Sequence, residues 1–151
     1  MTRTESILVK KSAYFVESLS SSKLIYNQSL YFLRQAYFDC LKNNTKIKTP
    51  TYNQLYKLVK NSDIFKDSPL DFVVKQYCIQ QASNNWTSFI KATMSFKKNP
   101  NKFKSRPLMP KYLKNDFNLI SIDNTRLRTK GCKEQEIRLP KSNFKFKLPN
   151  Y

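Results

Sequence analysis

The sequence contains no histidine and only one glycine, and both shortages limit the chemistry that it can perform. Without histidine there is no Ser-His-Asp triad and no imidazole general base. A single glycine cannot build the glycine-rich loops that hold phosphates in P-loop and dinucleotide-binding proteins. These shortages argue against the commonest classes of enzyme site, and we expect no cofactor.

Cysteines are also few, and Cys40, Cys78 and Cys132 lie far apart with no CxxC pair among them. Without histidine or paired cysteines a zinc site has no ligand set, and three distant cysteines do not suggest a disulfide framework. Cys40 and Cys78 lie on apolar helical stripes, so we expect both in the core. No apolar run reaches transmembrane length and no signal peptide is recognisable. The sequence therefore predicts a soluble, cytoplasmic protein.

Acidic residues are the third shortage, with 10 Asp and Glu against 28 Lys and Arg, a formal net charge of +18. The acids are scattered, and none occurs between Asp71 and Asp116. An AT-rich coding sequence also produces many lysines, but it does not explain this uneven placement. A compact chain of such charge repels itself unless a polyanion neutralises it. We expect nucleic acid as the partner, with a membrane surface or an acidic protein as alternatives.

Apolar periodicity predicts three helices between residues 20 and 98. The first should begin at the serines at positions 20–22, any of which can cap it, and end at Asn43–Thr45. Its predicted apolar face consists of Tyr26, Leu30, Leu33, Tyr37 and Leu41. A second, shorter helix should be capped by Thr51 and carry Leu55, Leu58 and Val59, followed by a loop at 61–63.

The third helix has the strongest local signal, because Ser68 is a candidate N-cap with Pro69 at the first helical position. Its apolar stripe is Leu70, Val74, Cys78, Ala82, Trp86, Phe89, Thr93 and Phe96. Pro100 is the outer limit of this helix. Trp86 is interpreted as a core residue more readily than as a platform for base stacking.

Short strands are predicted at both ends of the chain. A β-branched run at 6–11 predicts an N-terminal strand, and residues 117–122, 125–128, 136–139 and 144–148 predict a set of C-terminal strands. The fold class is therefore α+β, with a three-helix lobe inserted between a short N-terminal strand and a small C-terminal β-barrel or antiparallel sheet.

The segment from 97 to 114, called here the basic connector, contains seven cations, three prolines and no acid. The prolines argue against a helix, so we expect an extended segment. Cations along such a segment can neutralise phosphates, and the neighbouring Phe96 and Phe103 can stack on bases. A solvated lysine-rich loop is the alternative. The candidate phosphate ligands are Lys97, Lys98, Lys102, Lys104, Arg106 and Lys111.

Four further polar residues lie off the apolar stripes of the predicted helices: Asn27, Arg34, Asn84 and Asn85. Side chains of these types can reach phosphates or base edges, so they complete the set of candidate nucleic-acid-binding residues. For Asn27 and Arg34 a purely structural role is equally consistent with the pattern. We predict no catalytic residue and no metal ligand.

Five stretches along the chain resemble, in the same order, stretches in the N-terminal part of the TnpB/OrfB proteins of insertion sequences. These stretches are residues 4–11, 24–31 with 33–35, 84–89 with 91–92, 102–107 with 110–112, and 137–141. That family consists of transposon-encoded RNA-guided nucleases, also described as transposases. The resemblance implies a wedge β-barrel interrupted by a helical recognition lobe, which together hold guide RNA and double-stranded target DNA.

The resemblance also implies a division of the chain into a first wedge strand (1–18), a helical recognition lobe (19–98), and a basic connector with wedge strands (99–151). Cutting in the family belongs to a downstream domain with three acids and paired cysteines, and these 151 residues contain neither. We therefore expect a nucleic-acid-binding part without the nuclease domain, which is not itself an enzyme. A non-enzymatic DNA-binding regulator acting at transposon ends is the alternative. No membrane and no small-molecule substrate is expected as a partner.

Overall fold

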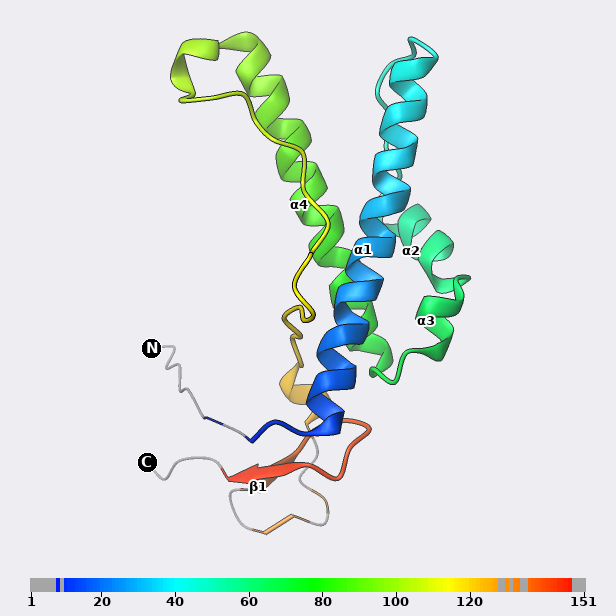
Figure 1. The fold of residues 1–151 in the computed structure, drawn as a ribbon, viewed down its shortest axis with the longest axis vertical. Helices are drawn as coiled ribbons and strands as arrows, with labels where there is room; N and C mark the ends of the chain where they lie inside the picture. Colours follow the sequence, from blue (N-terminus) through cyan, green and yellow to red (C-terminus); the bar gives the residue numbers. More distant parts are fainter. Residues whose placement is uncertain (1–7, 9, 128–129, 131, 134–135, 148–151) are drawn as a thin grey trace.

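The computed structural model describes residue 8, residues 10–127, residue 130, residues 132–133 and residues 136–147. These residues form a helix-rich structure with one small antiparallel sheet, which confirms the predicted α+β class (Figure 1). The elements are α1 (Ala13–Lys42), α2 (Tyr52–Lys60), α3 (Asp63–Asp67), α4 (Phe72–Lys98), the short 3-10 helices η1 (Pro100–Lys102) and η2 (Asn124–Arg126), β1 (Glu136–Arg138) and β2 (Lys145–Lys147). In the described part of the chain no helix is long and apolar enough to cross a membrane.

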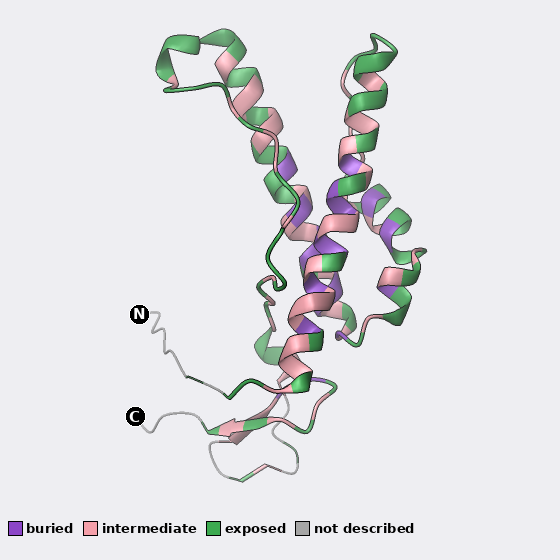
Figure 2. Ribbon diagram, viewed as in Figure 1, coloured by how far each residue is buried: buried purple, intermediate pink, exposed green. Residues whose placement is uncertain are grey.

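The hydrophobic core lies between the two long helices, with α2 and α3 covering one side of α1 (Figure 1). Its buried side chains end at Leu33 on α1 and at Trp86 on α4. Beyond these positions the two helices diverge, and most of the surface of their far ends is exposed (Figure 2). An edge-to-face contact of Trp86 with Tyr37, with ring centroids 5.7 Å apart, and a contact of Trp86 with Phe89 at 5.5 Å close the core at this end.

The predicted apolar faces are largely confirmed. On α1, Tyr26, Leu30 and Leu33 are buried and Tyr37 packs against the core, but Leu41 is exposed. Of the three apolar residues predicted for α2, Leu55 and Val59 lie in the core, while Leu58 is exposed. On α4 the buried residues from the predicted stripe are Val74, Cys78, Ala82 and Trp86, and Leu70 is buried just before the helix.

The predicted start of the first helix is wrong, because α1 begins at Ala13. Ser22 caps nothing. Ser22 lies within α1 and is fully buried against α4. Its hydroxyl lies 3.3 Å from the Cys78 sulfur and donates to the Leu119 carbonyl at 3.0 Å. A small hydroxyl side chain suits both a helix cap and a close helix–helix contact, so the sequence did not separate the two roles.

The start of α4 is also corrected. Ser68 does not cap it, because Ser68 ends α3 in an extended conformation, as the residue before a proline favours. Asp71 is the N-cap instead, and its carboxylate accepts from the Val73 amide at 3.0 Å. The predicted loop at 61–63 is in part a helix start, since the Ser62 side chain caps α3 by accepting from the Phe65 N–H, and Phe65 is buried. The capping role of Thr51 is confirmed by a complete capping box with Gln54.

The thiol of Cys40 is not in the core. It lies near the end of α1, where it contacts the backbone of Lys48, with a sulfur–nitrogen distance of 3.5 Å. Cys78 is buried as predicted, and burial raises the pKa of its thiol above the ordinary value. The predicted end of α1 is confirmed, because Asn43 caps the helix and Asn44 adopts a left-handed backbone with φ of 50°.

Between η1 and η2 the chain has no regular secondary structure, and we call residues 103–123 the return segment. The strand predicted at 117–122 is wrong. The apolar residues Ile120 and Ile122 pack against the helical core, and the backbone N–H of Asn118 donates to the Leu19 carbonyl of α1. Alternation of apolar side chains is satisfied here by the surface of the helical bundle, without a neighbouring strand.

The C-terminal sheet is a hairpin of two strands, with Ile137 opposite Phe146. The strands predicted at 136–139 and 144–148 are therefore confirmed at 136–138 and 145–147, while 139 and 144 lie outside them and 148 lies outside the described residues. The strand predicted at 125–128 is wrong over its described residues, since η2 occupies 124–126. The N-terminal strand predicted at 6–11 lies outside the described residues except for Leu8, Lys10 and Lys11, none of which is in a strand.

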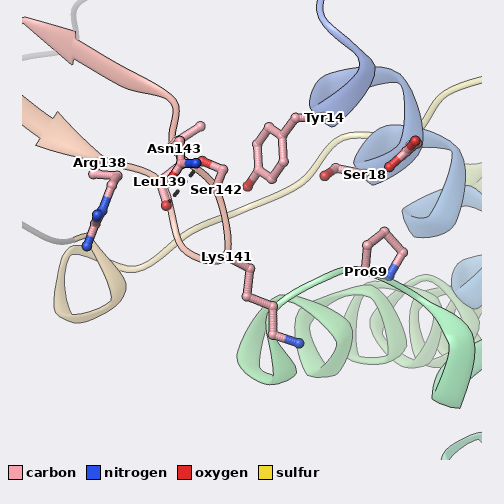
Figure 3. A pocket seen from close by; sticks show the side chains of 9 residues that line it. Tyr14, Ser18, Pro69, Arg138, Leu139, Lys141, Ser142 and Asn143 are labelled. Atoms are coloured by element: carbon pink, nitrogen blue, oxygen red, sulfur yellow. Dashed lines mark hydrogen bonds between the residues drawn. The ribbon is translucent and has the colours of Figure 1, made fainter.

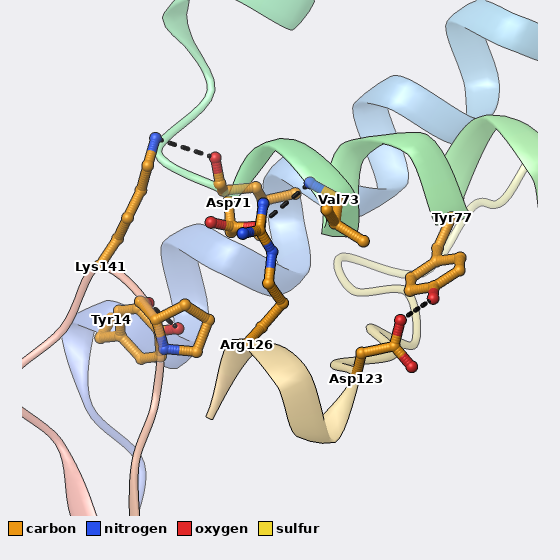
Figure 4. Close-up of polar contacts among 9 residues, drawn as sticks. Tyr14, Asp71, Val73, Tyr77, Asp123, Arg126 and Lys141 are labelled. Carbon is orange, nitrogen blue, oxygen red and sulfur yellow. Dashed lines mark hydrogen bonds and ion pairs between the residues drawn. The ribbon is translucent and has the colours of Figure 1, made fainter. Parts of the chain in front are cut away.

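Polar contacts fasten the C-terminal part to the helices (Figure 4). Arg126 Nε lies 3.1 Å from the Asp71 carboxylate, although its N–H is not aimed at the oxygen. Tyr77 donates a hydrogen bond to Asp123, and Lys141 donates to the Leu70 carbonyl at 3.2 Å. Asp71 thus links the start of α4 to η2 as well as capping the helix.

Candidate nucleic-acid interface

The far end of α4 and the turn after it, residues 96–106, carry the densest group of candidate cations, and we call this region the α4 tip. Lys97 and Lys98 belong to the last helical turn and Lys102 to η1, so the connector is not extended from its first residue as predicted. The ring of Phe96 meets that of Phe103 edge to face at 5.6 Å, which fixes the turn and uses part of both rings. The packing of these two rings therefore holds in place the backbone that carries the cations of the turn.

All seven cations of the basic connector are exposed, and none of them forms an ion pair with a described residue. Between described residues, ion pairs join Lys66 to Asp63 and Arg126 to Asp71. Unpaired exposed cations on a fixed backbone are ready to contact phosphates without first breaking an internal interaction. Figure 2 shows how far this exposed end of α4 projects from the buried core.

The second half of the connector is held against α1 by Asn27 and Arg34, two of the predicted nucleic-acid-binding residues. Asn27 makes two hydrogen bonds to the backbone of Leu113: its amide donates to the carbonyl at 3.1 Å and its oxygen accepts from the N–H at 2.9 Å. Arg34 donates to the Pro110 carbonyl at 3.0 Å. The two residues therefore position the return segment, and the structural reading that the sequence left open is the one the contacts favour.

Replacing Asn27 with alanine should lower the free energy of unfolding by about 1–3 kcal/mol, because it leaves both backbone groups of Leu113 without these partners in a part-buried place. Urea denaturation measures this loss. Asn84→Ala is the control, since Asn84 is exposed and its amide oxygen accepts from Gln80, which lies one turn away on the same helix. The control should cost less than about 0.5 kcal/mol. Equal losses in the two variants would contradict a stabilising role for the hydrogen bonds between Asn27 and Leu113.

Arg34 has a second set of contacts, which are aromatic. Its guanidinium carbon lies 5.0 Å from the centre of the Tyr112 ring and 5.9 Å from that of Phe38. The cation thus lies between a ring of the return segment and a ring of α1. Both rings remain partly open to solvent, with 38% of Tyr112 and 46% of Phe38 exposed.

The asparagines of α4 differ in their partners. Asn85 donates to the hydroxyl of the buried Tyr26 at 3.0 Å, so its amide helps to join α4 to α1. Among the described residues Asn84 hydrogen-bonds through its side chain with Gln80 alone, and it is exposed. Neither residue lies at the α4 tip, because both precede Trp86 near the end of the core.

Lys75 is a buried cation and is therefore not available to a nucleic-acid ligand. Only 6% of it is exposed, its ammonium donates to the Phe65 carbonyl at 2.6 Å, and it lies 4.9 Å from the Phe65 ring. Burial and the nearby charge of Lys141 lower the pKa of Lys75 below its ordinary value, while Asp67 acts in the opposite direction. Lys75 serves the α3–α4 junction.

A cavity of about 540 Å³ lies between the first turns of α1, Pro69 and the β-hairpin (Figure 3). Arg138 and Lys141 line it, but Lys141 already binds the Leu70 carbonyl and the Tyr14 hydroxyl donates to the Pro140 carbonyl at 3.1 Å. Glu17 adds a negative charge to the lining. The cavity therefore marks a joint between two parts of the molecule and is not our candidate site.

No three His, Cys, Asp or Glu side chains among the described residues come together in a group that could hold a metal ion. Comparisons of the chain with protein families, with curated proteins and with solved structures find no match. The functional argument consequently depends on the charge, exposure and contacts of the residues described above.

Proposed function

We propose that this chain binds nucleic acid through the basic connector, as the gripping part of a TnpB-like transposon protein that holds guide RNA and double-stranded target DNA. The observation that carries the proposal is the row of seven exposed connector cations that have no acidic partner among the described residues and are presented by a helix end and a docked segment. Phosphates are the ligands that such cations bind with release of counterions.

The arrangement of the ends of the described chain supports the TnpB-like part of the proposal. The first turn of α1 contacts the C-terminal hairpin, with the rings of Phe15 and Phe144 4.9 Å apart and Tyr14 bonded to Pro140. A helical lobe that interrupts a wedge domain must leave and re-enter that domain at one place, and the hairpin beside the start of α1 is compatible with this requirement (Figure 1). On this proposal the hairpin is part of the wedge β-barrel and the helices form the recognition lobe.

Binding should be strongly salt-dependent. If about 6–8 cations reach phosphates, the logarithm of the association constant should fall against the logarithm of salt concentration with a slope of about −4 to −7. Titrations of labelled RNA and duplex DNA at several salt concentrations measure the slope. A nearly flat line would show that the charge serves a different kind of partner.

The effect of RNA on DNA binding separates the TnpB-like role from that of a regulator acting on DNA alone. A guide-dependent module should hold target DNA more tightly when RNA transcribed from the flanking genomic region is bound first. Equal DNA affinity with and without that RNA would favour the DNA-binding regulator.

A further inference from the structure

We propose that Phe38 and Tyr112, with Arg34 between them, form a platform on which unpaired bases stack, so that the interface takes a single-stranded segment of nucleic acid. The inference rests on the proposed function and adds to it the form of the ligand. It concerns side chains that the sequence pattern did not single out as binding residues, apart from Arg34.

The platform is built by two parts of the chain that are distant in sequence. Tyr31, Arg34 and Phe38 share one face of α1 by their helical spacing, and the return segment brings Tyr112 to the same face. The Arg34 hydrogen bond to Pro110 and the Asn27 bonds to Leu113 fix the backbone on both sides of Tyr112. The rings are therefore held in place before any ligand arrives.

The exposure of these rings is what calls for a partner. Tyr31 is 45% exposed, comparable to Phe38, although large aromatic side chains usually bury most of their area. The core behind them is already closed by Tyr37, Trp86 and Phe89, so further folding of the described residues does not cover them. Exposed aromatic rings and an arginine plane beside cations are the groups that stack on splayed bases.

The charges nearby select the occupant. Lys111 and Lys114 flank Tyr112 in the chain and are exposed. The helix α1 contains two acids, Glu17 and Asp39, and only Asp39 is a sequence neighbour of Phe38. A strand of nucleic acid supplies both phosphates for the lysines and flat faces for the rings. In a duplex the bases already stack on one another and cannot reach the rings.

The test compares a thymidine single strand of about 16 nucleotides, the upper site size of one single-strand-binding fold, with a blunt duplex of equal length. The double variant Phe38→Ala, Tyr112→Ala should bind the single strand at least about fivefold more weakly for each ring removed. Its affinity for the duplex should stay within about twofold, and its salt slope should not change because no cation is lost. Leu58→Ala, at an equally exposed apolar site on α2, should change neither affinity.

A second variant, Phe38→Leu with Tyr112→Leu, keeps apolar packing and removes only the flat rings, and it should show the same selective loss if the alanine variant folds poorly. A 2-aminopurine placed within the single strand should be quenched on binding to the unchanged protein and less so with either variant. Unchanged single-strand affinity, or an equal loss on both probes, would overturn the platform while leaving salt-dependent binding intact. Failure of the unchanged protein to bind either probe would overturn the proposed function as well.

Discussion

Replacing Lys102, Lys104 and Arg106 together with glutamine is expected to weaken nucleic-acid binding about 100-fold or more at roughly 0.1 M salt. Each phosphate contact contributes ~0.7–0.9 to the salt slope, so three lost contacts remove about two decades of affinity at that concentration. The three side chains are exposed at the α4 tip and have no ion pair with a described residue. Titrations with the same probe and buffer for both proteins measure the loss.

Folding should be unaffected by this change, because exposed charges without partners contribute little to stability. The thermal midpoint should therefore stay close to that of the unchanged chain. A large drop in the midpoint would mean that the three residues are structural and would withdraw the α4 tip as the principal contact.

The matched control neutralises Lys23, Lys42 and Lys46, three cations of α1 and the linker after it. Lys42 and Lys46 are exposed, as the tip residues are, whereas Lys23 is half-buried. The control removes the same net charge and so reproduces any general electrostatic effect. An equal loss of affinity in the two triple variants would show that binding is spread over the surface and would refute the localisation.

Trp86→Ala should lower the free energy of unfolding by about 3–5 kcal/mol, the largest stability effect of any change proposed here. Trp86 is only 2% exposed and packs with Tyr37 and Phe89 where α1 and α4 diverge. Removing the indole leaves a large cavity at the last layer of the core. Urea unfolding followed by circular dichroism measures the loss without relying on tryptophan fluorescence.

Trp86→Phe is the control for this variant. The indole N–H has no hydrogen-bond partner among the described residues, so phenylalanine removes an unpaired donor and keeps an aromatic ring at the site. We expect this change to cost less than about 2 kcal/mol. A near-normal stability of Trp86→Ala combined with a loss of nucleic-acid binding would instead identify Trp86 as a stacking residue.

The helical part of the fold could be predicted from periodicity because its signals are local. Thr51 with Gln54 forms a cap within one turn, and Val74, Cys78, Ala82 and Trp86 repeat at the helical period. Local signals failed where one residue type suits two environments. Ser22 and Ser68 both looked like caps, yet one is buried between helices and the other ends α3.

The candidate site divides in the same way. The sequence alone determined the charge of +18, the acid-free connector and the exposed lysines that follow from it, since lysine side chains without partners remain in water. Only the tertiary structure decided that Asn27 and Arg34 hold the return segment, because hydrogen bonds across 86 and 76 residues leave no local pattern. The same docking brings Tyr112 to Phe38 around one guanidinium, a neighbourhood that exists only after α1 and the return segment have packed together.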